Sequence, residues 1–237
     1  GRSETFVPVD TEAVQPAMIE AIQQLVDAHG GAEIEAVVST DGDSDRPLVL
    51  GVEGGRVRFF PGDLLGLVVA EYLEVRHVAV PVSANDAVDR WCAARGIELV
   101  KTRIGSPYVI TAMREVGWEA NGGFLTARTL RVPAGGELGG LPTRDAFLAI
   151  LAALCASLGQ GLSLGQVFAR LPARFGKSDL VRPFPRESSL GILARFRPAD
   201  ERIEQVDYRA DGLRLRTAGG EVAGGLPEGT SRAEGRH

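Results

Sequence analysis

Residues 36–46 read AVVSTDGDSDR, a short apolar run that leads directly into three aspartates at alternate positions. The β-branched residues Val37 and Val38 favour a strand, and we expect that strand to be buried. Gly42 allows the chain to turn after the strand without a Cβ clash. The stretch therefore predicts a buried strand that ends in an acidic loop.

Strand and helix patterns alternate on both sides of this stretch. Apolar periodicity predicts a helix over residues 13–28 before it, with Asp10 or Thr11 as its N-cap. After it, Gly54 and Gly55 join two strands into a hairpin. Further strands are predicted at residues 77–82, 98–101, 190–196 and 212–217, and helices at residues 62–73, 85–95, 107–115, 143–158 and 164–170. This alternation predicts layered α/β structure with a mainly parallel sheet.

The composition excludes several classes of protein. Of 237 residues 44% are hydrophobic, and the net charge of -5 offers no broad basic surface, so we expect no nucleic-acid partner. No apolar run of about 18 residues occurs, so we expect no membrane span. The two cysteines, Cys92 and Cys155, are too sparse for a disulfide framework. We interpret them as reduced, buried thiols, and we expect a soluble, cytoplasmic protein.

The aspartate loop is a candidate metal site. Asp41, Asp43 and Asp45 can turn alternate side chains toward one hard cation, and without a cation or a basic neighbour they would repel one another. Arg46 could supply part of the neutralisation. A calcium-binding helix–loop–helix does not fit, because Arg46 stands where that loop needs glycine and Val52 where it needs glutamate. A solvated acidic turn is the remaining alternative.

A second polar loop, GWEANGGF at residues 117–124, is a candidate sugar site. Glu119 can accept hydrogen bonds from two hydroxyls, and Asn121 can both donate and accept. The neighbouring glycines, Gly122 among them, let the backbone approach a ligand closely. Taken alone, the pattern also fits an ordinary glycine-rich turn.

A third segment, KTRIGSPYV at residues 101–109, lies between a predicted strand and a predicted helix. Backbone N–H groups at the start of a helix and nearby cations can bind an anion. Arg103 and Ser106 are the candidate substrate-binding residues here. Lys101 is a further candidate, with an ordinary solvated lysine as its alternative.

Together the three segments resemble the α-D-phosphohexomutases in content, order and approximate spacing. The resemblance implies that Asp41, Asp43 and Asp45 hold Mg²⁺ and that Arg46 is an active-site arginine. It also implies that Glu119 and Asn121 bind the ring hydroxyls of the sugar. The Glu-Ala-Asn-Gly-Gly form of this loop resembles that of phosphomannomutases. Other members of the family are phosphoglucomutases and phosphoglucosamine mutases, and the latter remain an alternative.

The resemblance also implies a domain organisation of the α/β class. We expect the C-terminal part of the family's second domain at residues 1–60 and the third domain at 61–175. Both would be layered mixed-sheet domains. An incomplete fourth domain, of α+β type, would follow at 180–237. A sequence that starts partway through the second domain would expose a sheet edge near residues 5–9.

Members of the family move a phosphoryl group between C1 and C6 of a hexose phosphate through a phosphoserine and a bisphosphate. No serine in this sequence is followed by His-Asn or Asn-Pro, so no phosphoserine nucleophile can be assigned. The glycine-rich end, residues 224–232, matches the family's phosphate-binding loop only in part, because Glu228 adds a negative charge. We therefore expect a phosphohexomutase-type chain that is inactive by itself, its ligands being hexose 1- and 6-phosphates and hexose bisphosphate. The alternative is a non-catalytic fragment that only binds metal or sugar phosphate.

Overall fold

The computed structural model of the chain describes residues 10–176, Pro185, Ser188 and three short strands, β11 (Ile203–Asp207), β12 (Gly212–Thr217) and β13 (Gly220–Gly225). These strands form an antiparallel sheet in that order. The strand predicted at residues 212–217 is confirmed as β12. The predicted sheet edge at residues 5–9, the strand predicted near 190–196 and residues 226–232 lie outside the described residues.

The aspartate loop belongs to an N-terminal antiparallel sheet with the order β1-β2-β3. Its strands are β1 (Ala36–Thr40), β2 (Pro47–Glu53) and β3 (Arg56–Phe59), and the hairpin predicted at Gly54 and Gly55 joins the last two. The prediction that the first of these strands is buried is wrong: Val38 is 42% exposed. Among the described residues β1 pairs only with β2, so it is an edge strand, whereas β2 between its two partners is buried.

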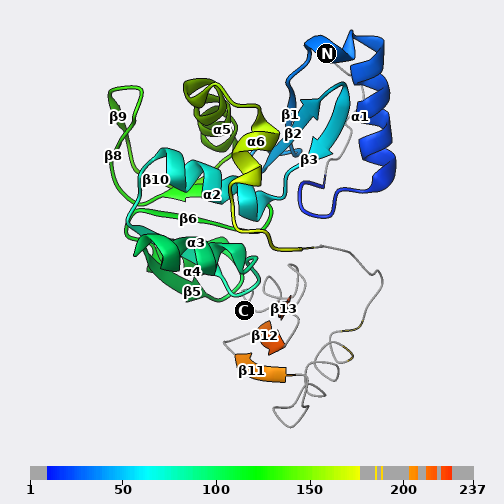
Figure 1. Cartoon of the computed structure of the whole chain (residues 1–237). Helices are drawn as coiled ribbons and strands as arrows, with labels where there is room; N and C mark the ends of the chain where they lie inside the picture. The colour runs from blue at the N-terminus through cyan, green and yellow to red at the C-terminus, as the bar shows by residue number, and fades with distance from the viewer. Residues whose placement is uncertain are drawn as a thin grey trace.

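Helix α1 (Pro16–Ala28) lies beside this sheet (Figure 1). It starts three residues later than the predicted helix, and Gln15, rather than Asp10 or Thr11, is its N-cap. The carboxylate of Asp10 instead accepts hydrogen bonds from the backbone N–H groups of residues 12 and 13, which forms a separate turn. Pro16 then occupies the first helical turn, where a missing N–H has no cost. A single 3₁₀ turn, η1 (Gly31–Glu33), leads into β1.

The second sheet has five strands in the order β10-β7-β6-β4-β5. Their bounds are β4 (His77–Pro81), β5 (Glu98–Thr102), β6 (Val116–Trp118), β7 (Phe124–Thr126) and β10 (Leu141–Asp145). Strand β4 runs parallel to both β5 and β6, while β7 is antiparallel to β6 and to β10. The sheet is therefore mixed, which confirms the mixed sheet that the family resemblance implied. The mainly parallel sheet predicted from the alternation of strands and helices holds only for its β6-β4-β5 half.

Helices cover both faces of this sheet (Figure 1). Val78 and Val80 of β4 belong to the large core that includes residues of α2 (Gly62–Tyr72), α3 (Ala87–Arg95), α5 (Ala146–Gln160) and α6 (Leu164–Ala169). Ala79 between them packs with Val109 and Met113, at α4 (Ser106–Ala112) on the opposite face. Successive strand residues point to opposite faces. The result is an α/β/α arrangement, with a small hairpin of β8 (Leu130–Arg131) and β9 (Glu137–Leu138) beside it.

The N-terminal sheet and the α/β/α layers share one core. Val49 of β2 belongs to the same cluster of buried side chains as the helices, and the Phe60 and Phe168 rings stack with centroids 3.9 Å apart. Ser163, the N-cap of α6, donates a hydrogen bond to Glu53 at the end of β2. This packing fixes the aspartate loop relative to the second sheet.

The two cysteines and the lengths of the helices can be compared with the predictions from the sequence. The two cysteines differ, because Cys92 is buried as predicted but Cys155 is exposed on α5. The prediction for Cys155 is thus wrong. Within the part of the chain that the structure describes, none of the helices combines the length and the apolar character that a membrane span requires.

Candidate active site

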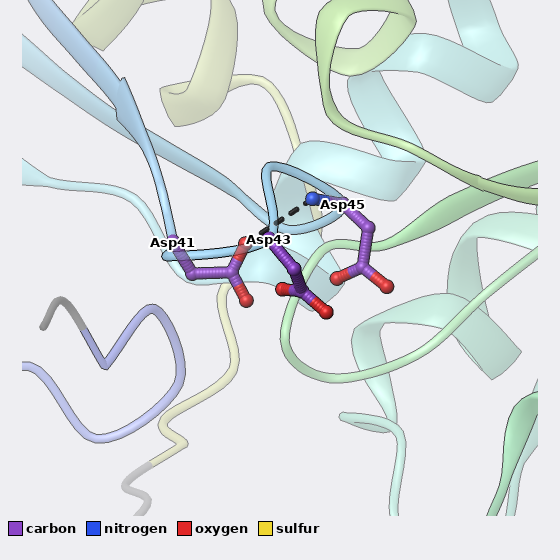
Figure 2. A group of neighbouring side chains, drawn as sticks. All are labelled: Asp41, Asp43 and Asp45. Atoms are coloured by element: carbon purple, nitrogen blue, oxygen red, sulfur yellow. Dashed lines mark hydrogen bonds between the residues drawn. The ribbon is translucent and has the colours of Figure 1, made fainter.

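The three aspartates lie together in the loop that connects β1 to β2, and Figure 2 shows their carboxylates gathered there. Asp41, Asp43 and Asp45 each present an oxygen within 4.8 Å of the others. Asp41 shapes the loop: its Oδ1 accepts hydrogen bonds from the backbone N–H groups of Asp45 at 3.2 Å and Arg46 at 3.1 Å. Ser44 completes the turn with a positive φ of 63°. The loop therefore holds three acidic side chains close together.

The electrostatics of Asp45 suit a cation. Burial raises the pKa of its carboxyl above the ordinary value, and the neighbouring charges of Asp43 and Asp41 raise it further, against the lowering effect of Arg144 and Arg46. Its buried Oδ1 atom has no hydrogen-bond partner among the described residues, although the Arg46 Nε atom lies 3.7 Å from it. A buried carboxylate oxygen beside two other carboxylates is a site that a hard divalent cation fits, since such cations prefer oxygen ligands.

Arg46 contributes positive charge at the same place. Its Nε atom lies 3.7 Å from Asp41 Oδ2 and 3.7 Å from Asp45 Oδ1. The side chain is 30% exposed, so these are ion pairs at the margin of the loop. The neutralisation that the sequence predicted for Arg46 is thus present in the structure.

The predicted sugar loop connects β6 to β7 and is tightly built. Glu119 and Asn121 are 4% and 1% exposed. The Asn121 Oδ1 atom accepts a hydrogen bond from the Gly123 N–H at 3.0 Å, and its backbone oxygen accepts one from the Thr11 hydroxyl at 3.2 Å. Gly122 has a φ of 85° and its N–H donates to the Glu119 backbone oxygen. Asn121 therefore shapes the loop, in addition to any contact with a ligand.

Arg144 connects the two loops, and the sequence analysis did not single it out. Its Nη2 atom lies 2.6 Å from Asp45 Oδ2, and its Nη1 atom lies 3.6 Å from Glu119 Oε2. The residue is at the end of β10, which pairs with β7 directly after the sugar loop. The sequence pattern placed Arg144 in the first turn of the helix predicted over residues 143–158, where an arginine is a common surface residue, whereas the structure places it in β10. Its partners are far away in sequence.

The third segment lies at the same end of the sheet. Strands β5 and β6 both run parallel to β4: Thr102 pairs with Pro81, and Gly117 pairs with Ala79. The carboxyl ends of these strands therefore bring residues 103 and 119 to the same edge of the sheet. Strand β4 separates them, which places the two backbones about 9–10 Å apart in the hydrogen-bonding direction. The topology thus gathers the three predicted segments along one side of the molecule.

The three candidate residues of this segment differ in their surroundings. The Arg103 guanidinium lies 5.5 Å from the centre of the Tyr108 ring. Ser106 opens α4 directly after Gly105, whose φ is 122°. Lys101 Nζ forms an ion pair with Asp89 Oδ2 of α3 at 3.0 Å, so it is not the solvated lysine that was the alternative prediction. Arg103 and Ser106 remain the better placed candidates for a ligand.

Comparison with known proteins agrees with these features. Residues 61–175 match the family model described as phosphoglucomutase/phosphomannomutase, alpha/beta/alpha domain III. A phosphomannomutase of Sinorhizobium fredii is 35% identical over 98% of this chain and 50% of its own length. One of Salmonella muenchen is 34% identical over 81% of this chain and 40% of its own length. The chain therefore spans half or less of the length of these curated relatives.

Solved structures show the same fold. A phosphoglucomutase/phosphomannomutase family protein of Burkholderia thailandensis aligns with 92% of this chain and 48% of its own, with a TM-score of 0.58 at 17% identity. The phosphoglucomutase parafusin of Paramecium aligns with 90% of this chain and 42% of its own, with a TM-score of 0.56 at 15% identity. These structures share the fold of this chain. The family-model match and the similarity to the two phosphomannomutases confirm the prediction that the chain belongs to the phosphohexomutase family.

Proposed function

We propose that the chain forms the metal- and sugar-binding part of a phosphomannomutase-like phosphohexomutase. Its ligands would be hexose 1- and 6-phosphates and hexose bisphosphate. One observation carries the proposal: Asp45 of the aspartate loop and Glu119 of the predicted sugar loop pair with the same guanidinium, that of Arg144. The two loops therefore face each other within the reach of a single hexose phosphate.

We propose the following roles for the residues. Asp41, Asp43 and Asp45 would hold Mg²⁺, which when bound would stabilise negative charge on a transferring phosphoryl group. Glu119 would accept hydrogen bonds from sugar hydroxyls, and the glycine backbone at Gly122 would let the ring approach closely. The other residues that we propose for the active site are Arg46 as a catalytic residue and Asn121, Arg103, Ser106 and Lys101 as substrate-binding residues.

The chain's own groups would act by binding and orientation. Arg46, close to two of the aspartates, would place a fixed positive charge where the phosphoryl group passes. Because Glu119 is already buried and held in place, it would lose little freedom when it binds hydroxyls. The sequence contains no His-Asn or Asn-Pro pair after a serine, so we assign no nucleophile within it.

We further propose that residues 1–60 form the C-terminal part of the family's second domain and that residues 180–237 belong to an incomplete fourth domain. The match to the third-domain model at residues 61–175 supports this division. The second candidate function follows from the same division, since a chain of half length could bind metal and sugar phosphate without catalysing transfer.

Calorimetry of Mg²⁺ binding tests the proposed metal site. We expect the chain to bind Mg²⁺ and an Asp43→Ala variant to lose that binding, while an Asp27→Ala variant, which removes an exposed aspartate from α1, keeps it. Equal binding by all three proteins would place the metal elsewhere, and binding by none would count against the proposed site in this chain.

A second measurement separates the two candidate functions. Conversion between hexose 1- and 6-phosphates is followed with and without added hexose bisphosphate. Conversion by this chain would support a catalytic role. Retained Mg²⁺ and sugar-phosphate binding without any conversion would support the binding fragment.

A further inference from the structure

Arg144 is held in place from two directions. Its backbone is fixed by β10, in which the neighbouring Asp145 pairs with Phe124 of β7. Its side chain lies across Gly123, where a Cβ would be only 2.6 Å from Arg144 Cδ. The absence of a side chain at Gly123 is therefore what lets the arginine stem cross the sugar loop toward Asp45.

The guanidinium is shared between two carboxylates that water screens only weakly. The side chains of Asp45 and Glu119 are 24% and 5% exposed, and that of Arg144 is 19% exposed. Arginine presents its donors in a planar fork, so two of its nitrogens can face two acceptors at once. The ammonium of a lysine is a single point charge and cannot hold both in the same way.

The two carboxylates come from loops that the proposed function assigns to different ligands. The Asp45 oxygen that Arg144 contacts is Oδ2, while Oδ1 is buried and has no hydrogen-bond partner within the described part of the chain. Holding one carboxylate oxygen fixes the direction in which the other points, as partners of metal ligands commonly do. The same Arg144 guanidinium also pairs with Glu119, so a displacement of one loop shifts the arginine and thereby changes its contact with the other loop.

We propose that Arg144 is a positioning residue that couples the aspartate loop to the sugar loop. This inference rests on the proposed function for the identity of the two ligands. The coupling itself is a property of the chain without ligands. Its structural basis is the pairing of one guanidinium with Asp45 and Glu119, and its consequence is that a perturbation of one loop reduces the order of the other.

Amide hydrogen exchange of the metal-free chain tests this coupling, with reporters in both loops. The N–H groups of Gly122 and Gly123 report on the sugar loop, and those of Asp45 and Arg46 report on the aspartate loop. Asp45→Asn perturbs one loop and Glu119→Gln the other. Each change is made in the wild-type, Arg144→Lys and Arg144→Met backgrounds, with Arg131→Met, an exposed arginine of β8, as the matched control.

We expect each substitution to speed exchange in the opposite loop by about threefold or more in the wild-type and Arg131→Met backgrounds. In the Arg144→Met and Arg144→Lys backgrounds the same substitutions should change the opposite loop by less than about 1.5-fold, since the shared partner is gone. Arg144→Lys keeps the charge, so loss of coupling there identifies the fork geometry as the cause. A residue that only stabilised the fold would give additive effects.

Cross-loop effects that are absent in the wild-type protein, or that persist unchanged without Arg144, would overturn the inference. If Arg144→Met fails to fold, Arg144→Lys alone decides the outcome. The measurement needs neither Mg²⁺ nor sugar phosphate. A failure of the proposed function in calorimetry is therefore distinguishable from a failure of the coupling.

Discussion

The contact between the start of α2 and the sugar loop gives the sharpest prediction. A Cβ built on Gly62 would lie 2.6 Å from the Asn121 carbonyl carbon and closer still to the Gly122 nitrogen and the Ala120 oxygen. All three are backbone atoms, so no side-chain rotation can relieve the clash. Replacing Gly62 with alanine must therefore displace the sugar loop or the helix.

The expected cost follows from the geometry. Overpacking a well-packed site costs typically 1–3 kcal/mol, and three backbone clashes place Gly62→Ala at the upper end, about 3 kcal/mol. For a chain of this size one kcal/mol shifts Tm by about 2–4 °C, so the variant should melt about 6–12 °C lower. The loss of loop order should also weaken any ligand binding at Glu119.

Thermal unfolding followed by circular dichroism checks this value, with Gly159→Ala as the matched control. Gly159 lies inside α5, and a Cβ there would meet no atom of the described residues within 4 Å. Alanine is favoured over glycine inside a helix by about 1 kcal/mol, so the control should melt about 2–4 °C higher. A Gly62→Ala protein that melts like the wild type would refute the close approach of α2 to the sugar loop.

Two further predictions concern buried groups away from the site. Burial raises the pKa of the Cys92 thiol to about 12, so a thiol reagent near pH 8 should label only the exposed Cys155 in the folded chain, and both cysteines in urea. Rapid labelling of two thiols in the folded state would contradict this. For Glu115, burial would raise the carboxyl pKa, but hydrogen bonds from the Arg76 and His77 N–H groups and from Arg128 outweigh it and lower the pKa below the ordinary value of 4.5. Glu115→Gln should therefore reduce the free energy of unfolding by about 1–3 kcal/mol near pH 7. The difference between the two proteins should shrink as the pH falls below about 4.5 and through the lowered pKa of Glu115. Urea titrations that give the same difference near pH 3 as near pH 7 would refute this prediction.

Much of the local structure could be predicted because it depends on neighbours in sequence. The hairpin at Gly54 and Gly55 needs only turn chemistry between two strands, and it is confirmed. The helix predicted over residues 62–73 is confirmed as α2, ending one residue earlier. The family was also predicted correctly from three short polar segments, because their residue types and order are specific in combination.

The errors concern properties that depend on distant parts of the chain. Val37 and Val38 favour a strand wherever it lies, but burial of that strand depends on a second partner, and β1 has only β2 among the described residues. Cys155 was predicted to be buried, yet it lies at an exposed position of α5. Strand patterns alone predicted a mainly parallel sheet because they do not reveal the antiparallel pairing of β7 with β6 and β10, whereas the family resemblance correctly implied a mixed sheet.

The candidate site shows the same division. The sequence by itself determined the acidic loop, the glycine-rich loop and their chemistry, because carboxylate spacing and glycine positions are local. Only the tertiary structure decided that Asp45 and Glu119 share the guanidinium of Arg144. These three residues span 45 to 144 in sequence. Their contact depends on the pairing of β10 with β7 beside the sugar loop and on the packing of β2 in the shared core. Such long-range packing is a property of the whole fold, which no local pattern contains.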